Sequence, residues 1–183
     1  MAKRRMKKSL ACIIALLLSP AAQAQQLPPN YVGRVGGVTN EVCVSPTVTA
    51  GAYTAGNVVG GLITFPNAFL TANTGVLQSV RLTSKSVQTA EFDITFFSSL
   101  PATVFTDKTA PSIVAADVLL TQPPIMLTNN FSGLGTHTVY GADGIGRAVN
   151  EVGSSAYALI TTAGTPTFAS TSDVQLCAAW LED

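Results

Sequence analysis

Apolar and polar residues alternate with a period of two in several short stretches of this chain. The alternation is clear at residues 91–97, where Phe92, Ile94 and Phe96 take turns with charged and polar residues. Successive side chains of a β-strand point to opposite faces of the sheet, so this pattern predicts a strand with one buried face. Residues 76–85 show the same pattern and predict a second such strand.

Within residues 76–85, the alternation places Val76, Val80 and Leu82 on one face and polar residues on the other. Further strands are predicted at residues 42–44, 57–65, 137–140, 156–161 and 173–181, with Gly, Pro, Asn and Asp in the gaps between them. No stretch has a capped helical period, although residues 110–120 could form a short turn. Many short strands with turns between them predict a single all-β domain, an antiparallel β-sandwich or jelly roll, over residues 41–183.

The first 24 residues have the layout of a secretory signal peptide. Five basic residues lie between positions 3 and 8, an apolar run follows at residues 10–18, and Ala22-Gln23-Ala24 supplies small residues at the cleavage positions. We therefore predict a signal peptide over residues 1–24, with cleavage between Ala24 and Gln25. The apolar run is about half as long as a bilayer-spanning helix, which predicts no stable membrane anchor after cleavage.

The composition changes after the predicted cleavage site. Residues 25–40 are rich in Gly and Pro and have no apolar period, which predicts an extended arm that precedes the domain. Cleavage would leave five of the ten basic residues against all ten acidic residues. A mildly acidic chain with scattered basic residues is a poor ligand for phosphate backbones, so we expect no binding of nucleic acid.

The predicted mature chain keeps two cysteines, Cys43 near its start and Cys177 near its end. In an oxidising compartment they would pair most simply as a disulfide; two unrelated buried thiols are the alternative. In the last predicted strand, four apolar residues share one face and Cys177 lies on the other. Cys43 likewise lies opposite Val42 and Val44, so paired first and last strands would bring the sulfurs together outside the core. The predicted signal peptide and the predicted disulfide both fit export to the periplasm or the extracellular space.

Candidate catalytic groups are few. His137 is the chain's single histidine and is expected to be an ordinary strand residue. Glu91 and Asp93 could act as paired carboxylates, but two acids on the polar face of a strand are far more often solvated. The glycine-rich segment at residues 141–146 has the wrong spacing for a phosphate loop, and we predict a turn there, with Asp143 bonding locally. The sequence therefore predicts no catalytic, cofactor-binding or metal-binding residues.

The chain resembles a family of small β-sandwich proteins from the structural modules of tailed phages and prophages. The segments that carry the resemblance are 46–61 (PTVTAGAYTAGNVVGG), 77–80 (LQSV), 105–107 (FTD), 165–173 (TPTFASTSD) and 181–183 (LED). The resemblance implies a role in virion structure, as a capsid decoration or cement protein, and it supplies no catalytic residues. The predicted signal peptide and the cysteine pair depart from this family, because phage capsids assemble in the cytoplasm.

These observations favour an exported, non-enzymatic structural or assembly protein that acts through protein–protein contacts. Few charges and an extended arm suit a protein partner or self-assembly into a homo-oligomer. Two alternatives remain open. One is a secreted or periplasmic binding module for a surface protein or glycan, and the other is a hydrolase with an unrecognised site.

Overall fold

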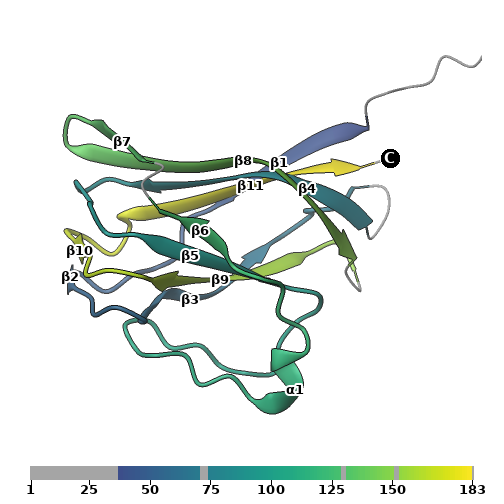
Figure 1. Ribbon diagram of the computed structural model, residues 1–183, viewed down its shortest axis with the longest axis horizontal. Helices are drawn as coiled ribbons and strands as arrows, with labels where there is room; N and C mark the ends of the chain where they lie inside the picture. The colour runs from purple at the N-terminus through teal and green to yellow at the C-terminus, as the bar shows by residue number, and fades with distance from the viewer. Residues whose placement is uncertain (1–36, 71–73, 129–130, 151–152, 183) are drawn as a thin grey trace, which may run out of the picture. The chain divides into compact units, whose positions relative to one another are not determined.

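The computed structural model describes residues 37–70, 74–128, 131–150 and 153–182, and these residues form an antiparallel β-sandwich (Figure 1). One sheet has five strands in the order β1-β11-β4-β8-β7. These strands span Val38–Val44, Val174–Glu182, Thr74–Ser84, His137–Asn150 and Phe131–Leu134. All neighbouring strands in it are antiparallel.

The second sheet has four strands in the order β3-β9-β5-β6. They span Val58–Phe65, Ala156–Thr162, Phe92–Phe97 and Ile125–Leu127. A short ribbon pairs β2 (Gly51–Ala52) with β10 (Thr167–Phe168), and the one described helix, α1, is a single turn at Ala115–Val118. The all-β prediction is confirmed. No helix in the described part of the chain is long and apolar enough to cross a membrane.

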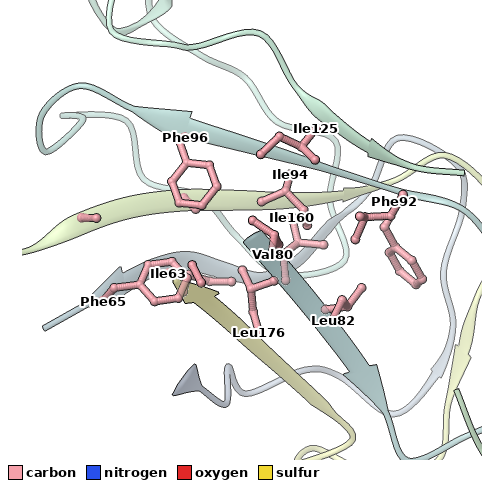
Figure 2. Packing of buried hydrophobic residues seen from close by; sticks show 14 of the residues in the cluster. Ile63, Phe65, Val80, Leu82, Phe92, Ile94, Phe96, Ile125, Ile160 and Leu176 are labelled. Carbon is pink, nitrogen blue, oxygen red and sulfur yellow. The ribbon is translucent and has the colours of Figure 1, made fainter. Parts of the chain in front are cut away.

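The core lies between the two sheets and is filled by their inward-facing residues. Figure 2 shows Ile94 and Phe96 of β5 gathered with Val80 of β4 and Leu176 of β11, and all four are at most 1% exposed. Trp180 is fully buried among aromatic rings, with its centroid 5.2 Å from that of Phe65. Burial of each such side chain contributes about 1.5–3 kcal/mol to folding. The alternation predicted for β5 and β11 is therefore confirmed.

The alternation predicted for β4 is wrong in its first part. Leu77, not Val76, belongs to the buried core. The neighbouring strand β11 pairs Ala179 with Ser79 and Trp180 with Leu77, so Gln78 is an extra residue in β4. A β-bulge of this kind reverses the facing of the residues on one side of it, which the local sequence pattern did not reveal.

A second bulge overturns the turn predicted at residues 141–146. This segment lies inside β8, which is much longer than the four residues expected. Ser79 pairs with Asp143 and Leu77 with Arg147, so β8 has two more residues than β4 over this interval. Gly144 and Gly146 absorb the extra length with φ angles of 65° and 63°, which other residues rarely adopt. The strand bends there and does not reverse.

At the N-terminal end, β1 begins at Val38, so the last residues of the predicted arm are already part of the sheet. Val38 and Thr39 are exposed and have no apolar period; they form a strand because they pair with Glu182 and Leu181 of β11. The predicted signal peptide, its cleavage site at Ala24 and Gln25, and most of the arm lie outside the described residues.

A disulfide joins Cys43 of β1 to Cys177 of β11, two residues that are directly opposite in the ladder. The predicted pairing is confirmed, and so is the placement of both sulfurs on the face of the sheet away from the core. The bond closes a sequence separation of 134 residues. It therefore restricts nearly the whole described chain in the unfolded state.

Replacing both cysteines with alanine (C43A/C177A) should lower the free energy of unfolding by about 2–5 kcal/mol, because the unfolded chain gains entropy. Urea denaturation with a fluorescence readout measures this. Wild-type protein under a strong reductant should converge on the variant's midpoint. Equal midpoints for the variant and the oxidised wild type would contradict the prediction.

The bulge in β4 predicts opposite results for two adjacent residues. Leu77→Ala should cost about 2–5 kcal/mol of stability, because it removes a fully buried side chain from the core. Val76→Ala should cost less than about 1 kcal/mol, because this side chain lies outside the core cluster. Chemical denaturation of the two variants under the same conditions distinguishes the observed register from an unbulged one, which would give the reverse order.

Candidate interaction surface

Residues 98–121 make up most of the connection from β5 to the short strand β6 and form a third layer, which we call the loop layer. It covers the face of the four-stranded sheet that points away from the five-stranded sheet (Figure 1). A second apolar cluster holds it there, with Phe105 of the loop layer packed on Phe97 of β5 at a centroid distance of 5.6 Å. The other members of this cluster are Val58 and Leu159, with Leu62, Ile113, Leu120 and Tyr157 partly buried around them.

Asp117 fixes the shape of the loop layer. Its carboxylate is 3% exposed and accepts hydrogen bonds from the backbone N–H and the hydroxyl of Thr103, both at 2.6 Å, and from the Ala102 N–H at 3.2 Å. The hydroxyl bond from Thr103 lowers the pKa of Asp117, and the backbone bonds add to this effect against the opposing effect of burial. The Val114 N–H also donates to the Thr103 hydroxyl. These hydrogen bonds therefore hold helix α1 against the segment around Thr103.

Asp107 joins the loop layer to the segment before β3. It accepts hydrogen bonds from the Tyr53 hydroxyl at 2.7 Å, the Thr49 N–H at 2.7 Å and the Gly60 N–H at 2.6 Å. Burial alone would raise the pKa of Asp107, but these donors outweigh it and hold the pKa below its usual value. Burial, together with the bond to Asp107, raises the pKa of Tyr53.

Gly60, whose N–H donates to Asp107, lies at a position that only glycine fits. Its φ angle is +75°, and a Cβ atom there would lie 2.3 Å from the Cβ of Pro46. The glycine at position 60 thus has a structural reason: its backbone approaches Pro46 closely while its N–H donates to Asp107.

The loop layer exposes several large aliphatic side chains. Leu119 and Val104 are 87% and 88% exposed. We define the loop patch as these two residues with Leu100, Val114 and Val118, all at least half exposed. The three charged residues of the loop layer are Asp107, Asp117 and Lys108, and Lys108 lies over the Tyr53 ring with its Nζ 5.5 Å from the centroid. All three are therefore engaged within the fold, and the patch presents aliphatic groups to solvent.

The structure does not gather the candidate catalytic residues into a site. His137 is exposed at the start of β8, where its Nδ1 lies 3.0 Å from the Thr136 hydroxyl. Asp93 lies on the outer face of β5, where burial raises its pKa, and Glu91 precedes the strand. No hydrogen bond or ion pair in the described part of the chain joins either residue to His137. Their arrangement is that of separate polar residues.

Glu41, Cys43 and Cys177 offer ligand atoms within 4.8 Å of one another, the spacing of a metal site. The two sulfurs are bonded to each other, and a thiolate is the form of cysteine that binds metals. In the oxidised protein this group is therefore a disulfide with a neighbouring carboxylate.

Sequence reasoning missed the loop patch and the roles of Asp107 and Asp117. One signal was present: only three of the 24 residues in segment 98–121 are charged, while eight are Val, Leu, Ile or Phe. That composition suggests apolar contact on both sides of the segment. The partners of the two carboxylates had no such signal, because Thr49 lies 58 residues from Asp107 in the sequence.

Replacing Asp107 with asparagine should destabilise the protein by about 1–2 kcal/mol at neutral pH, an estimate reduced for solvent screening of a half-buried group. A carboxyl group whose pKa is lowered by folding stabilises above its unfolded pKa, and this stabilisation is lost as the pH falls. The difference in the free energy of unfolding between wild type and D107N should therefore be largest above about pH 5 and should shrink below about pH 4. Urea denaturation across that range measures it; a difference that does not depend on pH would contradict the assignment.

No protein-family model matches this chain, and no curated protein sequence shows a significant match to it.

Proposed function

We propose that this protein is an exported, non-enzymatic structural protein that assembles through protein–protein contacts, with the loop patch as its contact face. The observation that carries the proposal is the placement of Val104 and Leu119, which are nearly fully exposed although the layer that bears them is firmly anchored. Large aliphatic side chains that a folded domain exposes within one layer are a mark of interaction sites. The clasps at Asp107 and Asp117 keep that surface preorganised, which reduces the entropy lost on binding.

A second copy of the same chain is the occupant that fits this surface best. Identical patches can meet across a two-fold axis only if they do not repel each other, and the loop patch contains no free charge. The predicted mature chain is acidic elsewhere, with ten acidic residues against five basic ones. Contact between copies at the uncharged patch minimises this repulsion.

Export is part of the proposal and rests on two observations. The N-terminal sequence has the layout of a signal peptide, and the Cys43–Cys177 disulfide is of the kind that persists in oxidising compartments. The resemblance to structural proteins of tailed phages supports the structural role. The disulfide and the leader together favour a relative of those proteins that functions outside the cytoplasm.

The alternative, a binding module for a glycan, has less support. Recognition sites for small molecules commonly use aromatic side chains with a few convergent polar groups. The large hydrophobic residues that are exposed in the described structure are Val, Leu and Met, whereas Trp180 and the largest Phe side chains are buried. Aliphatic side chains without aromatic rings fit contact with protein better.

The loop patch can be tested by adding charge to it. The V104D/L119D variant should weaken self-association at least about tenfold, because burying two carboxylates in the contact is costly. Light scattering coupled to size-exclusion chromatography, run over a wide range of protein concentrations, measures this. The stability of the monomer should change by no more than about 0.5 kcal/mol, because both residues are on the surface.

The matched control is V87D/L134D, which replaces the same two residue types at exposed positions outside the loop layer. It adds the same charge and should leave association unchanged. Self-assembly through this face would be refuted if both variants weakened self-association equally, or if the wild-type protein were monomeric at every concentration. Binding of the wild type, but not V104D/L119D, to another envelope protein would indicate the binding-module alternative.

A further inference from the structure

The two sulfurs of the Cys43–Cys177 disulfide differ sharply in their accessibility. Cys177 lies on β11, between β1 and β4, and is 1% exposed. Cys43 is exposed and lies on β1, one of the two edge strands of the five-stranded sheet in the described part of the chain. An attacking thiolate must approach one sulfur in line with the sulfur that leaves. Only the Cys43 side of the bond is open to such an approach, from the edge of the sheet.

The group beside the buried sulfur is a cation. Arg81 of β4 pairs with Cys177 across the ladder, and its Nη2 lies 3.5 Å from the Cys177 Sγ. A neighbouring guanidinium favours the thiolate form of cysteine, and a thiolate that is better stabilised leaves a disulfide faster. The same Nη2 lies 3.0 Å from a carboxylate oxygen of Glu41, so Arg81 is shared between Glu41 and the sulfur.

We propose that Cys43 is a reversible thiolation site: small-molecule thiols of the glutathione class attack its Sγ, and Cys177 leaves as a thiolate stabilised by Arg81. The incoming thiolate forms a new S–S bond with Cys43, and the electron pair of the broken bond remains on Cys177. The small thiol loses its proton to solvent before it attacks, and no further oxidant or reductant is needed. The product is a mixed disulfide at Cys43 beside a buried thiolate.

The same geometry makes the modification self-reversing. The Cys177 thiolate is shielded from external reagents, but it stays opposite Cys43, since the β1–β11 ladder runs over seven residue pairs. Asn40 of β1 also donates to the carbonyl oxygens of Asn67 and Ala68, which helps to hold the strand. Attack by Cys177 on the mixed disulfide therefore restores the original bond when the small thiol is removed.

The position of the adduct tests the proposal directly on the wild-type protein. The native oxidised protein is incubated with reduced glutathione, quenched with acid, and mapped by peptide mass spectrometry. The glutathione adduct is expected on Cys43. In a parallel sample, from which free glutathione is removed before the acid quench, the adduct should disappear. An adduct mainly on Cys177, or no adduct unless denaturant is present, would overturn the proposal.

The role of Arg81 is tested by two substitutions with opposite expected effects. Arg81→Gln should slow the opening of the disulfide by glutathione about three- to tenfold, because the leaving thiolate loses its cation. Glu41→Gln should accelerate it, because Arg81 is no longer shared and a nearby negative charge is removed. Lys85→Gln is the control: it removes one positive charge beyond the end of β4 and should leave the rate unchanged.

Both effects should shrink at high salt, since Arg81 and Glu41 each have side chains that are 51% exposed and are screened by ions. A purely structural effect of the substitutions would not depend on salt in this way. Equal rates for R81Q and wild type at low salt, or the same slowing in K85Q, would refute the assignment of Arg81.

Discussion

The rest of the structure depends on the packing of the two sheets against each other. The inward-facing side chains of one sheet, on β4, β8 and β11, are removed from water only by contact with those of the other, on β3, β5 and β9. Trp180 is fully buried in this packing, with its ring centroid 5.2 Å from that of Phe65 and 5.9 Å from that of Phe69. Because the inner faces must meet, the strands cannot slide by one residue without exposing their whole apolar set. The two bulged strands are accommodated inside this constraint, with Leu77 brought to the core by the extra residue in β4.

Carboxylates perform a task that apolar contacts cannot, which is to hold loops by accepting hydrogen bonds from their backbone N–H groups. Asp107 and Asp117 do this for the loop layer, Asp173 accepts from the Ala169 N–H, and Glu182 accepts from the Leu70 N–H. Each bond between a carboxylate and a backbone N–H is charge-assisted and stronger than a neutral one. Much of the chain's acidity therefore serves internal anchoring, and the same anchoring allows aliphatic residues of the loop layer to remain on the surface.

The disulfide occupies the side of the five-stranded sheet opposite the core, so it stabilises the fold chiefly through the unfolded state and not through packing. Its exposed half lies at a sheet edge, while the proposed contact face covers the other sheet. Assembly and thiol chemistry are therefore assigned to opposite sides of the sandwich, and each can be tested without disturbing the other.

The sequence left the pairing of Cys43 and Cys177 open between a disulfide and two separate thiols, but it determined the fold class, the inward faces of β5 and β11, and the outward placement of both cysteines. These follow from a side-chain period of two, which is a local property of any strand. Only the tertiary structure decided the bulge at Gln78, the continuation of β8 through residues 141–146, and the anchoring of the loop layer by Asp107 and Asp117. A bulge depends on the number of residues in the neighbouring strand. The anchoring by Asp107 and Asp117 depends on hydrogen-bond donors that lie 14 to 58 residues away in the sequence. No local pattern encodes such partners, so the surface they support became visible only once the chain had folded.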